Sequence, residues 1–233
     1  MVKIKICGIR REEDVRCVNT HLPDYVGFVF AKSRRQVSPL EAKMLAGSLN
    51  ASIKKAGVFV NEEASKIAEI VAECGLDVVQ LHGDETPEYI VDLRLKLGRL
   101  NQKGRPLLAS GPPEPEKAAP FGPKVEIWKA VRVKDKSSLD KLKNYEADKF
   151  LLDAYSEGNY GGTGETFDWS LAVEAKKYGS IVLAGGLNSQ NIKEAVSIVK
   201  PCVVDVSSGV ETDGRKDEAK IRDFINMARY HAY

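Results

Sequence analysis

Residues Ile181 to Glu211 read IVLAGGLNSQNIKEAVSIVKPCVVDVSSGVE, and this stretch decides the fold. Its first part is a short apolar run at 181–184, a glycine turn at 185–188, and a segment at 192–199 whose apolar side chains recur at helical spacing. A second apolar run follows at 201–205. Short apolar runs that alternate with helical segments are typical of parallel strands joined by helices, so the stretch predicts two consecutive β–α units.

Small residues stand at the end of both predicted strands. Glycine allows backbone N–H groups to approach an anion closely, and a following helix adds a partial positive charge at its N-terminus. One glycine turn alone is explained equally well as a tight turn, but two such turns after successive parallel strands match the phosphate site of (β/α)₈ barrels. We therefore predict a phosphate site made by Gly185, Gly186, Ser207, Ser208 and Gly209.

The length and composition of the chain fit one barrel domain. A (β/α)₈ barrel usually needs about 200–250 residues, and this chain has 233 residues, of which 43% are hydrophobic. Dividing the chain among the units of such a barrel leaves about 29 residues for each, close to the size of a βα unit. We expect one α/β domain over residues 1–233, folded as a (β/α)₈ TIM barrel.

Charge and cysteine spacing argue against several classes of protein. The formal net charge is +2 and no long basic run occurs, so no nucleic-acid partner is indicated. No stretch has the apolar length of a membrane span, and no secretory leader precedes the first predicted strand. The four cysteines are widely spaced and form no C-x-x-C pair, which argues against a zinc site and against disulfides. We expect a cytoplasmic protein without a metal, either monomeric or homodimeric.

An irregular segment interrupts the repeated pattern at residues 98–124. Six of the 10 prolines of the chain lie there, together with several glycines, which rules out a regular helix or a central strand. The segment is also longer than an ordinary connection in this fold. We interpret it as a Pro/Gly-rich insertion between the fourth helix and the fifth strand, on the N-terminal side of the barrel and away from the catalytic face.

The first predicted strand, at residues 2–7, alternates between apolar and polar positions. Cys7 therefore shares a face with Lys3 and Lys5 at the carboxyl end of the strand. A lone cysteine is most often a small buried hydrophobic residue. A neighbouring cation, however, lowers the pKa of a thiol and favours the thiolate, which can act as a base or a nucleophile. The lysine face makes Cys7 a candidate catalytic residue.

Further polar residues follow the predicted strands at the same end of the barrel. Asp153 and Asp205 each close an apolar run, where the alternative explanation is a structural turn or helix-cap aspartate. His82 also closes an apolar run, although a histidine there is most often a structural hydrogen-bonding residue. Arg34 and Arg35 lie in the loop after the second strand. Either guanidinium can hold a carboxylate through two hydrogen bonds, or both are simply solvated.

Taken in order along the chain, these segments resemble the phosphoribosylanthranilate isomerases, a family of tryptophan biosynthesis. Each motif alone is weak, but their order is highly specific, and the resemblance runs from Met1 to the last helix apart from the insertion. The matching segments are KICG at 5–8, VGFVF at 26–30, GVFVN at 57–61, VQLHG at 79–83, LLD at 151–153, GGTG at 161–164, FDW at 167–169, GGLN at 185–188 and VDVSSGV at 204–210.

The resemblance implies an Amadori rearrangement of a small phosphosugar, from an aminoaldose to an aminoketose, without a metal or organic cofactor. By their positions in the matching motifs, Cys7 is similar to the family's general base and Asp153 to its general acid. Arg35 is similar to the arginine that holds the anthranilate carboxylate, and the two turns predicted above are similar to the phosphate grip. His82 and Asp205 are expected to contact the substrate as well.

Other phosphosugar-binding proteins would share some of these features but not all of them. Another phosphosugar isomerase or epimerase of the barrel class would keep the phosphate turns, but not Cys7, Asp153 and the arginine loop together. The histidine-pathway isomerase is disfavoured because no half-barrel repeat is evident in the sequence. A non-catalytic phosphosugar-binding module would lack the acid or the base. Both candidates are present here, which favours an enzyme.

Overall fold

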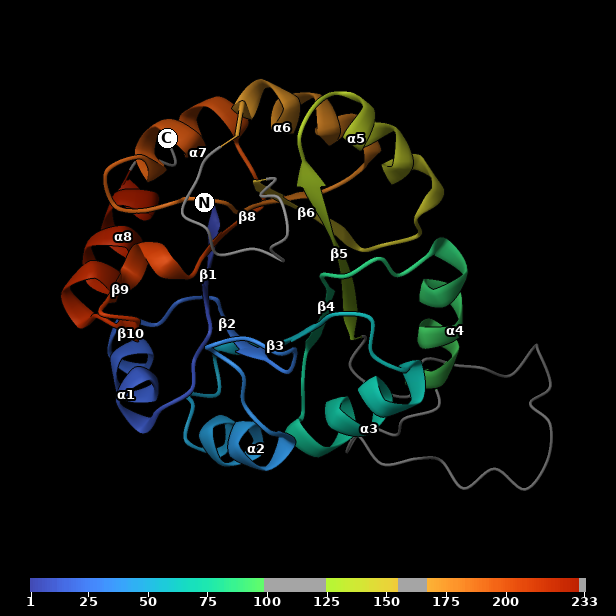
Figure 1. Ribbon diagram of the computed structural model, residues 1–233. Helices are drawn as coiled ribbons and strands as arrows, with labels where there is room; N and C mark the ends of the chain where they lie inside the picture. The colour runs from blue at the N-terminus through green and yellow to red at the C-terminus, as the bar shows by residue number, and fades with distance from the viewer. Residues whose placement is uncertain (99–124, 155–166, 231–233) are drawn as a thin grey trace, which may run out of the picture.

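The computed structural model describes residues 1–98, 125–154 and 167–230. In this part of the chain, parallel strands form a closed barrel in the order of the sequence, and β8 returns to pair with β1 (Figure 1). The predicted (β/α)₈ barrel is confirmed, whereas the insertion predicted at 98–124 lies, except for Gly98, outside the described residues. The strands are β1 (Lys3–Cys7), β2 (Tyr25–Val29), β3 (Lys54–Phe59), β4 (Val78–Leu81), β5 (Glu126–Val133), β6 (Lys149–Ala154), β7 (Ile181–Leu183) and β8 (Val203–Val206).

Helices alternate with the strands and cover the outside of the barrel (Figure 1). They are α1 (Glu12–His21), α2 (Pro39–Gly47), α3 (Ala64–Cys74), α4 (Pro87–Leu97), α5 (Ser137–Asp140), α6 (Trp169–Ala175), α7 (Ile192–Val199) and α8 (Glu218–Tyr230). Shorter elements are the 3₁₀ turns η1 (Lys141–Asn144), η2 (Lys176–Tyr178) and η3 (Ser208–Val210), and a hairpin of β9 (Glu211–Thr212) and β10 (Arg215–Lys216). Within the described ranges, none of the helices combines the length and the apolar character needed to cross a lipid bilayer.

Capping residues explain where α2 and α4 begin. The Ser38 hydroxyl accepts the backbone N–H of Glu41 at 3.3 Å, and the Glu41 carboxylate accepts the backbone N–H of Ser38 at 2.7 Å. The Thr86 hydroxyl accepts the backbone N–H of Tyr89 at 3.3 Å. A proline occupies the first turn of both helices, where its missing N–H costs nothing. These caps fix where the loops after β2 and β4 enter their helices.

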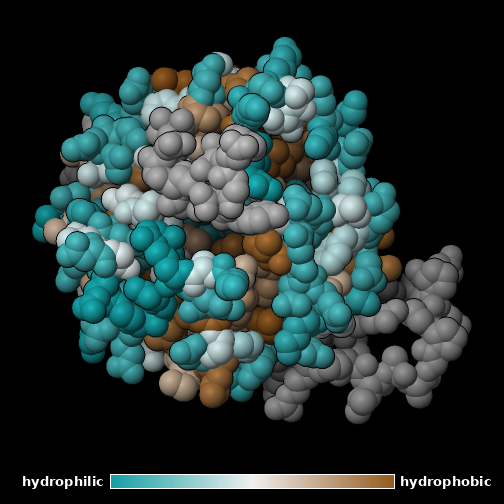
Figure 2. Space-filling view, in the orientation of Figure 1, coloured by the Kyte–Doolittle hydropathy of each residue, from teal (hydrophilic) through white to brown (hydrophobic). Residues whose placement is uncertain are grey.

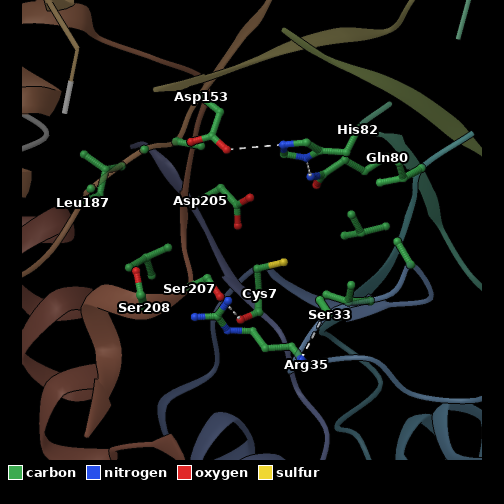
Figure 3. Close-up of a pocket in the computed structure, with 18 of the residues that line it drawn as sticks. Cys7, Ser33, Arg35, Gln80, His82, Asp153, Leu187, Asp205, Ser207 and Ser208 are labelled. Carbon is green, nitrogen blue, oxygen red and sulfur yellow. Dashed lines mark hydrogen bonds and ion pairs between the residues drawn. The ribbon is translucent and has the colours of Figure 1, made fainter. Parts of the chain in front are cut away.

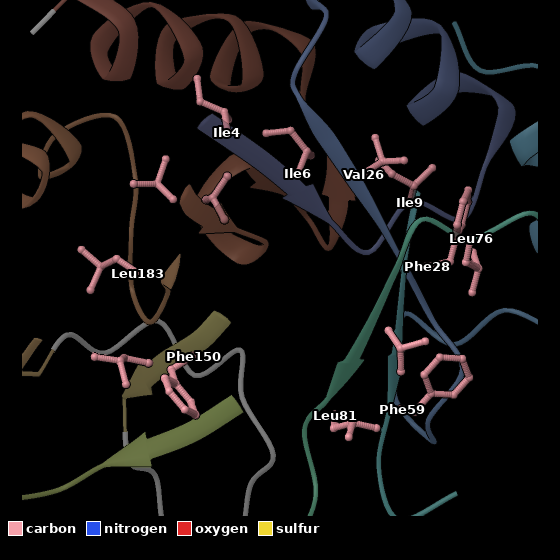
Figure 4. Close-up of a cluster of buried hydrophobic side chains, with 14 of the residues drawn as sticks. Ile4, Ile6, Ile9, Val26, Phe28, Phe59, Leu76, Leu81, Phe150 and Leu183 are labelled. Atoms are coloured by element: carbon pink, nitrogen blue, oxygen red, sulfur yellow. The ribbon is translucent and has the colours of Figure 1, made fainter. Parts of the chain in front are cut away.

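The outward faces of the strands pack against the helices. Side chains from neighbouring strands form one apolar layer there, as the close-up in Figure 4 shows, and each member is almost fully buried. Burying an aliphatic or aromatic side chain of this size stabilises the fold by about 1.5–3 kcal/mol. Members of this layer include Ile4, Ile6, Val26, Phe28, Phe59, Leu81, Phe150 and Leu183.

The inward faces of the strands fill the barrel itself. Near its N-terminal end, the rings of Tyr25 and Trp128 meet edge to face with their centroids 5.1 Å apart, and Leu151, Val182 and Val203 pack in the same cluster. Strands such as β2 and β7 are buried on both faces and have nearly continuous apolar runs, as in other parallel sheets, whereas β1 alternates and turns Lys5 inward. The interior is therefore a packed core below the carboxyl ends of the strands.

The alternation along the strands carries polar side chains to the carboxyl ends of the barrel interior. Lys5 is paired in register with Asp205 of β8, and Cys7 is paired with Gly27 of β2. A Cβ atom on Gly27 would lie 2.7 Å from the Cys7 sulfur, so only glycine leaves room for this thiol. In Figure 2, hydrophilic residues cover most of the visible face, and hydrophobic residues are seen in the hollow near its centre.

Candidate active site

A pocket at the carboxyl ends of the strands brings together residues that are far apart in the sequence (Figure 3). Of the predicted site residues, Gly209 and the alternative arginine, Arg34, are absent from its lining. Gln80 of β4, two positions before His82, also lines the pocket. The predicted residues that do line it are Cys7, Arg35, His82, Asp153, Gly185, Gly186, Asp205, Ser207 and Ser208.

Cys7 lies at the end of β1, and only 8% of its surface is exposed. Burial raises the pKa of its thiol, and this effect outweighs Lys5, which lowers it. The expectation that the lysine face lowers the pKa of Cys7 is therefore wrong for the ligand-free protein. The physical reason is that desolvation of the thiolate dominates, while the Lys5 ammonium is shared with the Asp205 carboxylate. The direction of this pKa shift favours the thiol form of Cys7 at neutral pH.

Lys5 is fully buried beneath the pocket and holds two side chains from other strands. Its Nζ donates to Asp205 Oδ2 at 3.0 Å and to Gln80 Oε1 at 2.9 Å. Burial lowers the pKa of Lys5, but the Asp205 carboxylate and the other neighbours raise it by more, so the ammonium stays charged. A buried charge is tolerated when it is paired and hydrogen-bonded in this way. Lys5 thus orients Gln80 and Asp205 toward the pocket.

Asp153 approaches the pocket from β6, across the barrel from Cys7 (Figure 3). Its Oδ2 lies 3.3 Å from His82 Nε2, and its Oδ1 accepts the backbone N–H of Ala154 at 3.0 Å. A Cβ atom at Gly185 would lie 3.1 Å from Asp153 Oδ1 and 2.6 Å from the Ala154 nitrogen, so the glycine leaves space for this carboxylate. The predicted acid and the predicted phosphate turn therefore lie next to each other.

The two predicted phosphate turns pack against each other. Gly185 and Gly186 have φ values of +82° and +62°, which favour glycine. A Cβ atom at Gly209 would lie 1.9 Å from the Leu187 carbonyl oxygen, so glycine is required where the turn after β8 meets the turn after β7. Gly209 therefore supports this end of the pocket although it does not line it. The Ser207 hydroxyl donates to the Cys7 carbonyl oxygen at 3.0 Å, which ties the same turn to β1.

The helix after the first turn covers the predicted segment at 192–199, so several residues separate the glycines from its start at Ile192. The left-handed glycines cannot start a right-handed helix, and two asparagine side chains hold the intervening backbone. Asn191 Oδ1 accepts the backbone N–H of Asn188 at 2.9 Å, and Asn188 Oδ1 accepts that of Gln190 at 2.8 Å. Glycine backbone geometry, rather than the helix terminus, therefore shapes this turn.

Arg35 lines the pocket, but its guanidinium is already held by a carboxylate. Its Nε donates to Glu211 Oε1 at 2.7 Å and its Nη2 donates to Glu211 Oε2 at 2.9 Å. Lys216 Nζ donates to Glu211 Oε1 at 2.9 Å and to the Ser207 carbonyl oxygen at 2.9 Å. Arg34 also reaches Glu211, at 3.1 Å, but its side chain is 61% exposed, against 12% for Arg35. The structure therefore places Arg35, and not Arg34, against the pocket.

Glu211 and Lys216 escaped the sequence analysis because no local pattern marks them. They lie on the hairpin of β9 and β10, and Glu211 is 176 positions from Arg35. Burial raises the pKa of Glu211, but the hydrogen bonds and charges of Arg35 and Lys216 outweigh it and lower the pKa to about 2. The sequence gives a clearer signal for Lys5 and Gln80. Each stands two positions before a predicted site residue, Cys7 or His82, and so shares its face of the predicted strand.

Comparisons with known proteins agree with this geometry. The model of the family described as N-(5'phosphoribosyl)anthranilate (PRA) isomerase matches residues 4–103 and 113–227. An N-(5'-phosphoribosyl)anthranilate isomerase of Acetivibrio thermocellus is 53% identical over 98% of this chain and 96% of that protein. One of Clostridium acetobutylicum is 48% identical over 98% of both chains.

Solved structures point to the same family. The phosphoribosyl anthranilate isomerase of Thermotoga maritima has a TM-score of 0.79 at 35% identity, covering 99% of this chain and 100% of that one. A phosphoribosyl anthranilate isomerase in complex with reduced 1-(o-carboxyphenylamino)-1-deoxyribulose 5-phosphate has a TM-score of 0.78 at 33% identity, with the same coverage. This chain therefore belongs to the N-(5'-phosphoribosyl)anthranilate isomerase family.

Proposed function

We propose that this protein converts N-(5-phosphoribosyl)anthranilate to 1-(2-carboxyphenylamino)-1-deoxyribulose 5-phosphate, an Amadori rearrangement of tryptophan biosynthesis. One observation carries the proposal: a thiol from β1 and a carboxyl group from β6 face one pocket, between a glycine turn and an arginine. Membership of the family supports the same reaction. Of the alternatives raised by the sequence, neither another phosphosugar isomerase nor a binding module accounts for all of these groups.

Asp153 is the proposed general acid of ring opening. It gives its proton to the ribose ring oxygen while the bond from that oxygen to C1 breaks, and the anthranilate nitrogen lone pair forms the C1=N bond of a protonated Schiff base. Asp153 is left as a carboxylate. Its position beside the His82 imidazole and the Gly185 turn supports this role, because the turn holds the sugar within reach.

Cys7 is the proposed general base. As a thiolate it takes the proton from C2, and the electrons of that C–H bond form the C1=C2 bond while the π electrons of C1=N return to the nitrogen. The resulting enolamine then tautomerises to the ketose. Because the thiol form of Cys7 is favoured in the ligand-free protein, the reactive form has its proton on Asp153 instead. In that form Cys7 and Asp153 together carry one proton.

The two ends of the substrate are proposed to bind at opposite sides of this pair. Gly185, Gly186, Ser207 and Ser208, supported by Gly209, would hold the phosphate, since their turns meet beside Asp153. Arg35 would hold the anthranilate carboxylate. A guanidinium has five N–H donors, and Glu211 occupies two positions on Arg35, Nε and Nη2, so further donors remain for a second carboxylate. His82 and Asp205 line the space between the two ends, where the sugar hydroxyls would lie.

We also propose a cytoplasmic enzyme with a single barrel domain over residues 1–233, acting as a monomer or a homodimer without a cofactor or nucleic acid. Cys7, Cys17, Cys74 and Cys202 are all free, as suits a reducing compartment.

The proposed function is tested by following the fluorescence of N-(5-phosphoribosyl)anthranilate, formed in the assay from its precursors. The wild-type protein should abolish this fluorescence with saturation kinetics. Cys7→Ser and Asp153→Asn should each lower kcat by about 10²–10⁴, the usual contribution of a general acid or base. Product binding should survive in both variants because the phosphate turns are untouched. A wild-type protein without turnover would contradict the function, and a Cys7→Ser variant with more than about a tenth of wild-type kcat would contradict the assignment of the base.

A further inference from the structure

A chain of side-chain contacts crosses the barrel beneath the pocket. Lys5 Nζ donates to Gln80 Oε1 at 2.9 Å, Gln80 Nε2 lies 2.9 Å from His82 Nδ1, and His82 Nε2 lies 3.3 Å from Asp153 Oδ2. Figure 3 shows the last two contacts, with Gln80 beneath the His82 ring and Asp153 opposite it. All four side chains are at least nine-tenths buried. Their contacts with one another, more than contacts with solvent, therefore decide which atoms donate hydrogen bonds and which accept them.

The charge of Lys5 decides which way the Gln80 amide points. An ammonium group has three N–H donors and no acceptor, so the atom of Gln80 that faces it must be the carbonyl oxygen. The amide nitrogen then has to face His82 Nδ1, and it can only donate. Turning the amide over would place its nitrogen against the Lys5 ammonium and its oxygen against His82 Nδ1. The contact with Lys5 would then join two donors, so this orientation is disfavoured.

The amide in turn decides where the histidine proton lies. Nδ1 must offer a lone pair to the Gln80 N–H, so a neutral His82 carries its proton on Nε2. A proton on Nδ1 would place two donors 2.9 Å apart in a buried site, and the hydrogen bond would be lost. Protonation of both nitrogens carries the same cost. The contacts thus favour the Nε2–H tautomer over the Nδ1–H tautomer, and an imidazolium would gain attraction to Asp153, 3.3 Å away, only by losing the hydrogen bond to Gln80.

We propose that Lys5 and Gln80 act as positioning residues that hold His82 as the neutral Nε2–H tautomer, which presents an uncharged donor beside Asp153. His82 Nε2 is buried and has no hydrogen-bond partner among the described residues, and its distance to Asp153 is longer than a well-formed bond to a carboxylate. The N–H is therefore available to an oxygen atom of a ligand in the pocket, such as a sugar hydroxyl.

The neutral state of His82 has a consequence for catalysis, which rests on the proposed function. An imidazolium beside Asp153 would favour the ionised carboxylate, whereas the general acid has to carry a proton. A neutral N–H donor orients the carboxyl group and the substrate without adding that charge. The tautomer itself follows from the contacts alone and does not depend on which reaction the protein catalyses.

The tautomer is measured by ¹⁵N–¹H correlation spectra of the ligand-free protein labelled at histidine. The chain has 3 histidines, and a His82→Asn variant identifies the signals of His82. At neutral pH the wild-type protein should show an unprotonated Nδ1 and a protonated Nε2. An unprotonated Nε2, or protons on both nitrogens, would overturn the proposal. This measurement needs no turnover, so it separates failure of the proposal from failure of the proposed function.

Gln80→Glu tests the cause, because it keeps the length of the side chain but replaces the donor facing Nδ1 with an acceptor. His82 Nδ1 should then become protonated, and kcat should fall at least about tenfold with a smaller change in KM. Asn144→Asp adds the same charge at an exposed position away from the pocket and should change neither readout. A Gln80→Glu protein with the wild-type tautomer would overturn the proposal, and so would a switched tautomer with wild-type kcat. If this variant does not fold, the spectrum of the wild-type protein still shows which His82 nitrogen carries the proton.

Discussion

Replacing Glu211 with glutamine should destabilise the protein at neutral pH, and progressively less as the pH falls toward 2. The carboxylate is 5% exposed and accepts hydrogen bonds from Arg35 at 2.7 and 2.9 Å and from Lys216 at 2.9 Å. Burial opposes its charge, but these cations outweigh burial and lower the pKa of Glu211 from 4.5 to about 2. This difference corresponds to at most about 3 kcal/mol. Solvent screening, above all of the exposed Arg34, reduces the expected contribution to about 2–3 kcal/mol.

The sign of the pH dependence follows from the direction of this shift. A carboxyl group whose pKa is lowered by folding contributes its full stability above the pKa of the unfolded chain and loses it as the pH falls. For Glu211 this window runs from 4.5 down to about 2. The difference in unfolding free energy between the wild-type protein and Glu211→Gln should therefore be about 2–3 kcal/mol at neutral pH and clearly smaller at about pH 3.

Urea denaturation at a series of pH values measures this difference. Glu69→Gln is the matched control, because Glu69 is 69% exposed and pairs with Lys66, itself 51% exposed, at 3.3 Å. Its effect should stay within about 0.5 kcal/mol at every pH. The reasoning is refuted if Glu211→Gln costs no more than this control at neutral pH. It is also refuted if the full difference persists at about pH 3.

Three further outcomes are expected. Arg35→Ala should raise KM far more than Arg34→Ala, because Arg35 lines the pocket and losing its charge-assisted pair with the substrate carboxylate costs about 1.5–3 kcal/mol. Equal effects on KM would show that Arg35 is not the residue that holds this carboxylate. The pH profile of kcat/KM should be bell-shaped, because a thiolate base and a protonated acid are both required, and burial of Cys7 places the alkaline limb above the ordinary thiol pKa. An alkaline limb below that value would argue against Cys7 as the base. Replacing most of residues 98–124 with a short linker should leave kcat largely intact. The reason is that α4 ends and β5 begins on the N-terminal side of the barrel, which in this fold contributes to stability and not to catalysis. A large loss of kcat in a folded variant would place the segment at the pocket.

Local patterns in the sequence determined the architecture and much of the site. The alternation at residues 2–7 put Lys5 and Cys7 on one face, and that face is the barrel interior. The apolar run before Asp153 likewise predicted the end of β6, where this carboxylate enters the pocket. Such patterns work because strand periodicity decides which side chains point inward, and all carboxyl ends of parallel strands meet at one end of the barrel.

Tertiary structure alone decided the charge states and the partners. The Glu211 carboxylate holds Arg35 across 176 positions, and Gln80 meets Lys5 across 75, so neither pairing has a local signal. The prediction of a lowered pKa for Cys7 failed for the same reason: the sequence shows a neighbouring lysine but not the burial that outweighs it. Periodicity depends on neighbours along one strand, whereas desolvation and hydrogen bonding depend on every group that the closed barrel brings within a few ångströms.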